Sequence, residues 1–206
     1  MKNNVLICFL SCKKNNNLWE KLLNINNSII FFGDPEINEP FIFKDNILTL
    51  KCNDTYDYLP VKIYLMIKAI LKIRKFNNIT HILKIDDWDT KVDNNTHNKL
   101  KYTNLTHYCG QNIINKYLGE RKYHFNKCPL NSIWNNKMYN GNFVPWADGG
   151  CGYILSRVAM NIISIQRLTI NKIYNNMIYE DVMIALLLYK SKIFPKKIPK
   201  IIIADK

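Results

Sequence analysis

The sequence lacks the features that would place it at once in several common classes. Its six cysteines are scattered and none forms a Cys-x-x-Cys pair, so we expect reduced thiols and no zinc site. No apolar run approaches the roughly 20 residues of a membrane span. Residues 5–10 are apolar, but no small-residue cleavage site follows them, which favours a first strand over a signal peptide.

Acidic residues are also scarce, and the imbalance gives a formal net charge of +13. Such an excess is typical of proteins that bind nucleic acids, anionic membranes or phosphate-bearing molecules. Lysine, asparagine and isoleucine are all abundant, however, which indicates AT-rich coding that fills surfaces with lysine whatever the function. The lysines are scattered and show no helix-turn-helix pattern, so we predict no specific nucleic-acid partner.

What is present is the pattern of an α/β domain. The chain has 206 residues, 48% of them apolar, which is enough for one domain with a real core. Segments of strand and helix type alternate, with helices expected at 19–25 and 59–71 between strands at 5–10, 29–32, 47–50 and 82–85. We therefore predict a single domain over residues 1–206, with a mainly parallel central sheet flanked by helices.

The segments between and after these elements carry weaker signals. Asp57 is expected near the N-cap of the helix at 59–71. Residues 92–101 are polar and receive no element, whereas 111–144 lack clean periodicity and are expected to form long loops, which are often functional. Residues 201–203 are a candidate last strand.

The stretch at residues 81–90 organises the rest of the sequence. It begins as a β-prone strand and ends in three carboxylates, Asp86, Asp87 and Asp89. Ligands bind outside the carboxyl ends of strands in open α/β sheets, and an Asp-x-Asp pair offers the oxygen ligands that Mg²⁺ or Mn²⁺ prefers. On this stretch alone, a solvated acidic turn is the alternative interpretation.

Two later motifs are ambiguous by themselves. Residues 149–152 contain three glycines, which allow close backbone approach, but no Walker loop follows, and a tight turn before a strand is the alternative. Ser156 is expected to cap a helix over 158–165. Glu180 and Asp181 precede the last apolar helix, where acidic side chains are ordinary partners of the helix dipole. Taken singly, neither motif assigns a function.

The order of these motifs is more informative than any one of them. Residues 54–62 open a helix, 84–89 end a strand, 149–156 follow, and 180–182 begin the last helix. This series resembles the β-1,3-galactosyltransferase and Fringe-like glycosyltransferases of family 31. Their motifs are Asp-Ser-Tyr-x-Asn-Leu-Thr-x-Lys, Lys-x-Asp-Asp-Asp, Gly-Gly-x-Gly-Tyr and Glu/Asp-Asp-Val. The resemblance covers roughly residues 5–190.

The resemblance implies a GT-A fold and a metal-dependent, inverting transfer of a hexose from a UDP-sugar to a hydroxyl of a glycan or protein acceptor. Asp87 and Asp89 then match the pair that binds Mn²⁺ (or Mg²⁺) and the nucleotide diphosphate, with the direct ligand left open between them. Asp86 supports the nucleotide side. Asp181 falls where the family keeps its catalytic base.

Further site residues follow from the same matches. The donor side is expected to include four residues: Lys62, Lys84, Gly149 and Gly150. The sugar and acceptor side is expected to include four more: Trp146, Asp148, Tyr153 and Glu180. The two lysines serve equally well as partners of local acids, and the tryptophan as a core residue.

Three departures separate the chain from the family pattern. Trp88 interrupts the acidic triplet, and no histidine follows His124, although the family usually has a histidine metal ligand near its C-terminus. We also see no membrane anchor or stem, which leads us to expect a viral or microbial member that works in the cytoplasm or, if viral, in the virion. The first two departures motivate an alternative, a catalytically inactive sugar-binding protein on the same fold.

Overall fold

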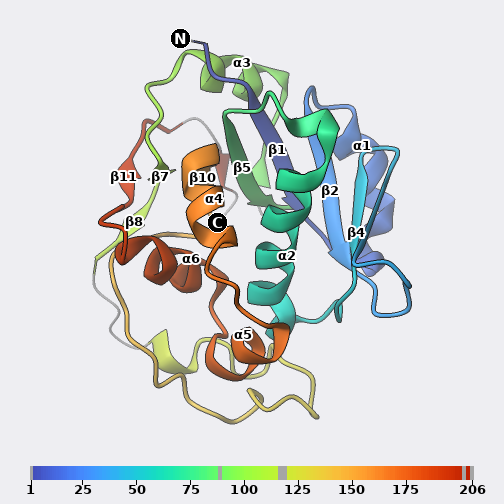
Figure 1. Cartoon of the computed structure of the whole chain (residues 1–206), viewed down its shortest axis with the longest axis vertical. Coiled ribbons are helices and arrows are strands. Elements are labelled where there is room, and N and C mark those ends of the chain that lie inside the picture. The colour runs from blue at the N-terminus through green and yellow to red at the C-terminus, as the bar shows by residue number, and fades with distance from the viewer. Residues whose placement is uncertain (1, 88–89, 116–119, 201–202, 205–206) are drawn as a thin grey trace.

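An eight-stranded sheet forms the centre of the computed structural model, which describes residues 2–87, 90–115, 120–200 and 203–204 (Figure 1). The strands lie in the order β11-β7-β10-β5-β1-β2-β4-β3. Their bounds are β1 Val5–Leu10, β2 Ser28–Gly33, β3 Phe41–Lys44, β4 Ile47–Leu50, β5 His81–Asp86, β7 Tyr108–Gly110, β10 Tyr153–Ser156 and β11 Lys196–Lys197. Two further pairs are short: β6 (Thr90–Lys91) with β12 (Ile203–Ala204), and β8 (Ile113–Ile114) with β9 (Trp146–Ala147).

Strand direction confirms the predicted fold class. The four inner strands β5, β1, β2 and β4 are parallel to one another. On one side of this group β10 runs antiparallel to β5, and on the other side β3 runs antiparallel to β4. All six residues of β1 and all six of β2 are buried, as expected of strands covered on both faces. The chain therefore has a mixed α/β fold with a large, mostly parallel central sheet, consistent with a GT-A-like arrangement.

Helices cover both faces of this sheet (Figure 1). The helices α2, α4 and α6 pack on one face and against one another, and α1 and α3 contribute to the core on the other face. Their bounds are α1 Trp19–Leu23, α2 Leu59–Lys72, α3 Asn94–Tyr102, α4 Arg157–Ser164, α5 Ile170–Asn176 and α6 Glu180–Tyr189. Across the described residues, none of the helices has the length and apolar character that crossing a bilayer requires.

Asp57 lies next to the N-cap residue of α2, as predicted, but its side chain does not cap the helix. The helix begins after Tyr58, whose side chain makes no capping hydrogen bond. Asp57 is instead buried, and its carboxylate accepts hydrogen bonds from Thr55 Oγ1 at 2.6 Å and from Tyr174 Oη at 3.1 Å. A short 3₁₀ turn, η2 (Tyr56–Tyr58), precedes the helix and turns Asp57 inward.

The predicted cap of α4 is confirmed, whereas two helices, α3 and α5, were not predicted. Ser156 caps α4 as predicted, because its Oγ accepts a hydrogen bond from the Ala159 amide at 3.2 Å. The polar segment 92–101 contains α3, which opens with a capping box between Asp93 and Thr96. The helix α5 was not predicted either. Of the candidate strand at 201–203, residues 201–202 lie outside the described part of the chain.

The register of β5 gives the sheet two chemically different ends. β10 runs antiparallel to β5, with Lys84 opposite Tyr153 and His81 opposite Ser156. The last residue of β5 is Asp86 and the first is His81. The acidic motif therefore lies where β5 ends. His81, where β5 begins, and Ser156, where β10 ends, lie together at the opposite ends of these two strands.

Candidate active site

A cavity of about 360 Å³ lies where β1 and β5 end, beside the loop before β10 and the first turn of α6. Of the residues predicted for the site, eight line it: Lys84, Asp86, Trp146, Asp148, Gly149, Gly150, Glu180 and Asp181. Three other predicted residues, Lys62, Asp87 and Tyr153, are described but are not part of its lining. The structure thus brings residues of all four sequence motifs to one cavity, because Tyr56 and Leu59 of the segment 54–62 also line it.

Lys84 is the centre of a buried polar network behind this cavity. Its Nζ donates to Glu180 Oε1 at 2.6 Å, to Asp86 Oδ1 at 2.8 Å and to the carbonyl oxygen of Gly149 at 3.3 Å. Tyr153 completes the network, because its hydroxyl donates to Glu180 Oε2 at 2.6 Å. Burial alone would lower the pKa of Lys84, but the two carboxylates outweigh it and the pKa is raised. Lys84 therefore pairs with nearby acids and links β5 to α6 and to residues 149–152, which we call the glycine loop.

Asp181 is held at the wall of the cavity by backbone amides. Its Oδ2 accepts a hydrogen bond from the Gly149 amide at 3.0 Å, and its Oδ1 accepts one from the Val182 amide at 2.8 Å. Burial and the neighbouring charge of Glu180 raise the pKa of Asp181 to about 7, against the opposing effect of these amides and of Lys84. A carboxylate with a pKa near neutrality is suited to accept a proton from a hydroxyl.

Gly149 is required by this arrangement. A Cβ at this position would lie 2.5 Å from Glu180 Oε1 and 3.3 Å from Asp181 Oδ2. Only glycine therefore lets the loop place its amide and its carbonyl against the first turn of α6. Further along the loop, Gly152 has a φ of 77°, which gives the tight turn into β10.

Asp87 points its carboxylate toward the segment that follows β1. Its Oδ2 accepts hydrogen bonds from Ser11 Oγ at 2.6 Å and from Asn15 Nδ2 at 3.0 Å, and the side chain is buried. The other predicted metal ligand, Asp89, lies outside the described residues, as does Trp88. Among the residues that the structure describes, no group of three or more His, Cys, Asp or Glu side chains is arranged to hold a metal ion.

Lys62 stabilises the loops near the ends of β2 and β4. It is buried, and its Nζ forms an ion pair of 2.9 Å with Asp54 Oδ1. Asp54 also accepts hydrogen bonds from the Gly33 amide at 3.1 Å and the Lys13 amide at 2.7 Å. Both lysines of the matched motifs therefore have an acidic partner close by, which was one of the two alternatives that the sequence left open.

Trp146, in β9, and Asp148, which directly follows this strand, both line the cavity. Trp146 is buried in β9 and packs on Phe143 with ring centroids 5.6 Å apart. Asp148 accepts hydrogen bonds from Asn112 Nδ2 and from the Gly150 amide, both at 3.0 Å. The tryptophan is therefore both a core residue and a wall of the cavity.

Several residues of the cavity were missed by the sequence analysis, among them two tyrosines and a lysine. Tyr56, Tyr123 and Lys127 all line it. The Nζ of Lys127 lies 3.2 Å from the ring centroid of Tyr123 and 5.6 Å from that of Tyr56, and it forms no ion pair with any described carboxylate. Two of these residues fall in the long segment 111–144, whose abundance of tyrosine was the only available signal.

Comparison with known proteins agrees with this geometry. A search of curated proteins finds no match to the chain. A family model described as Galactosyltransferase matches residues 37–199, a range that contains β5, the glycine loop and the start of α6. The match spans well over half of the chain and includes every described residue that forms the Lys84 network and the Asp181 site. The chain therefore belongs to the galactosyltransferase family.

Proposed function

We propose that the protein transfers a hexose from a UDP-sugar to a hydroxyl of a glycan or protein acceptor, with inversion and with a bound divalent metal. The observation that carries the proposal is Asp181, a carboxylate oriented by two amides at the cavity wall, with a pKa raised to about 7. Membership of the galactosyltransferase family supports glycosyl transfer.

In the proposed reaction, Asp181 removes the proton of the acceptor hydroxyl. As that oxygen forms its bond to the anomeric carbon, the bond from this carbon to the diphosphate oxygen breaks on the opposite face of the sugar. The proton passes to the Asp181 carboxylate, and the electron pair of the broken bond leaves with the diphosphate. The Gly149 and Val182 amides hold the carboxylate in place throughout, and general base help of this kind contributes about 10²–10⁴-fold in rate.

Asp87 and Asp89 are the proposed ligands of Mn²⁺ or Mg²⁺, with Asp86 on the nucleotide side. The described donors fit such ions, because Asp86 and Asp87 place carboxylate oxygens at the exit of β5, and Asp87 Oδ1 makes no hydrogen bond to a described residue. Ser11 and Asn15 orient Asp87 through its other oxygen. When bound, the metal would supply positive charge to the departing diphosphate.

Other residues that line the cavity are proposed to contact the donor on one side and the sugar or acceptor on the other. Gly149 and Gly150 let the donor approach the backbone closely, and Trp146 and Asp148 offer an aromatic face and a hydrogen-bonding carboxylate to sugar. Lys127 has no acidic partner among the described residues, which leaves its charge to face the cavity. We propose that it contributes to binding the diphosphate.

The test is nucleotide release from a panel of UDP-sugars, with GDP- and dTDP-sugars for comparison, each with and without Mn²⁺. Transferases leak some donor to water, so the acceptor need not be known. The expected result is Mn²⁺-dependent release of UDP from one donor. UDP binding without release from any donor favours the inactive sugar-binding alternative, and the lack of any nucleotide binding contradicts the proposal.

A pair of double variants tests the metal assignment separately. Asp87→Ala with Asp89→Ala is expected to abolish the Mn²⁺ dependence of UDP binding, because it removes both proposed ligands. Glu36→Ala with Glu39→Ala removes the same number of negative charges from exposed positions and is expected to bind UDP as the wild type does. Unchanged Mn²⁺-dependent affinity in the first variant would show that these aspartates are not the ligands.

A further inference from the structure

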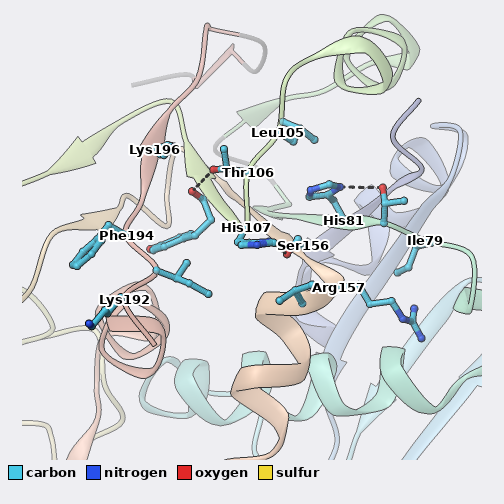
Figure 2. A pocket seen from close by; sticks show the side chains of 14 residues that line it. Ile79, His81, Leu105, Thr106, His107, Ser156, Arg157, Lys192, Phe194 and Lys196 are labelled. Atoms are coloured by element: carbon cyan, nitrogen blue, oxygen red, sulfur yellow. Dashed lines mark hydrogen bonds between the residues drawn. The ribbon is translucent and has the colours of Figure 1, made fainter. Parts of the chain in front are cut away.

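A second and larger cavity lies at the start of β5, whereas the candidate active site lies at the end of this strand. It encloses about 750 Å³ between the start of β5, the segment that leads into β7, the first turn of α4 and residues 192–196, which follow α6 (Figure 2). We call it the basic cleft. His81, at the first position of β5, and Ser156, at the end of β10, both line it, so the sheet itself separates the two cavities.

The charge that lines the basic cleft has one sign. None of the described residues that line it is acidic. Five of them are basic: His81, His107, Arg157, Lys192 and Lys196. None of the five takes part in an ion pair with any described residue, and Arg157 Nη1 donates to the carbonyl oxygen of Phe76 at 2.9 Å. A cleft with charges of one sign and low-dielectric walls focuses its potential and concentrates ions of the opposite sign.

A buried imidazole adds a hydrogen-bonding group inside the cleft. His81 is 9% exposed, and its Nδ1 lies 2.9 Å from Thr80 Oγ1. Figure 2 shows the ring between this hydroxyl and the interior of the cleft, on the side of His107. Its Nε2 makes no hydrogen bond to any described residue. His107 has the same pattern, since its Nδ1 lies 2.9 Å from Ser156 Oγ and its Nε2 has no described partner.

Two of the exposed side chains that line the basic cleft are apolar, and we call these two its apolar rim. Val158 is 49% exposed and Phe194 is 50% exposed, and both line the opening. Tyr189, itself exposed, packs on Phe194 with ring centroids 5.4 Å apart. Lysines next to exposed aromatic and aliphatic side chains are the combination found where proteins meet the interface of a bilayer.

We propose that the basic cleft docks the protein on the surface of an anionic membrane. In this arrangement the phosphate of one lipid head group enters the cleft and meets the imidazoles of His81 and His107. Val158 and Phe194 reach the boundary of the acyl chains, and Lys192 and Lys196 face neighbouring anionic head groups. A soluble phosphate would leave the apolar rim exposed to water, whereas a bilayer covers it. The proposal does not depend on the proposed transferase reaction.

The test is co-sedimentation of the full chain with lipid vesicles. Vesicles of phosphatidylcholine mixed with phosphatidylglycerol are expected to bind the protein, and vesicles of phosphatidylcholine alone are not. Lys192→Glu with Lys196→Glu is expected to weaken binding at least about tenfold, because each lysine near an anionic surface contributes substantially. Phe194→Ser, which leaves the charge unchanged, is expected to weaken it several-fold.

The matched control is Lys21→Glu with Lys44→Glu. It makes the same charge change at exposed positions in α1 and at the end of β3, the far edge strand of the sheet, and is expected to bind within about threefold of the wild type. Equal losses in the two double variants, or no binding to anionic vesicles, would overturn the proposal. So would wild-type binding by Phe194→Ser. Binding of glycerol phosphate without vesicle binding would assign the cleft to a soluble phosphate ester and contradict membrane docking.

Discussion

The two ends of β5 use charge in opposite ways. At the end that carries Asp86, the ammonium of Lys84 is buried and meets two carboxylates within 2.8 Å. At the end that carries His81, five basic side chains line a cleft, and no carboxylate is found among the described residues of its lining. Paired charges fix loops and a helix in place, whereas unpaired charges remain available to a ligand.

The largest loss of stability is expected for Glu180→Ala. The variant leaves the buried Lys84 with only Asp86 as a carboxylate partner and removes the acceptor of the Tyr153 hydroxyl. We expect the free energy of unfolding to fall by about 3 kcal/mol, at the low end for a broken buried pair because Asp86 remains. Urea denaturation measures it. Glu36→Ala, at an exposed position, is the control, and equal small losses in both variants would contradict the structural role of the network.

A smaller loss is expected for Ser156→Ala at the other end of the strand. Ser156 Oγ caps α4 through the Ala159 amide and also lies 2.9 Å from His107 Nδ1. Removing an N-cap hydroxyl lowers the free energy of unfolding by about 1 kcal/mol. Ser164→Ala, in the last turn of the same helix, makes the same chemical change without a cap. A loss as large for Ser164→Ala would show that the cap is not the cause.

The smallest effect on stability is expected for Lys192→Ala in the basic cleft. The side chain is exposed and forms no ion pair with a described residue, so the free energy of unfolding should change by less than about 0.5 kcal/mol. Glu180→Ala and Lys192→Ala should be measured in the same buffer, so that their changes in the free energy of unfolding can be compared directly. A loss above about 1 kcal/mol for Lys192→Ala would mean that this charge has a structural partner.

Local sequence patterns predicted the sheet and most of the helices. The buried runs of β1 and β2 and the helical period of α2 are properties of adjacent residues, so they can be read directly. The helix α3 was missed because its apolar face is small, although the capping box between Asp93 and Thr96 marks its start. Asp57 was assigned to a cap because its position fits one, while its partner Tyr174 is far away in sequence.

The candidate site was predictable only in part, because contacts between residues that are distant in the sequence position its side chains. The order of the motifs identified Asp86, Gly149 and Asp181, which the structure gathers at one cavity. The contacts that position them join distant residues, such as Lys84 with Glu180, and no periodicity encodes such a pair. The basic cleft draws on four separate segments between residues 79 and 196, so its charge could not be distinguished from scattered surface lysines.

The proposed role of Asp181 is tested by the pH dependence of turnover in the wild type and in Asp181→Asn, with donor binding measured alongside. Because the base must be deprotonated to accept a proton, wild-type turnover should rise with pH through about 7, the raised pKa of Asp181. Asp181→Asn should lose about 10²–10⁴-fold in turnover and the pH step with it, while donor affinity stays near wild type.

Asp45→Asn is the control, because it makes the same substitution at an exposed position with a φ of 51°, which asparagine tolerates. It should behave as the wild type in turnover, pH dependence and donor binding. Loss of turnover confined to Asp181→Asn, together with loss of the pH step near 7, is the result that the proposed mechanism predicts. Turnover close to wild type in Asp181→Asn would contradict it.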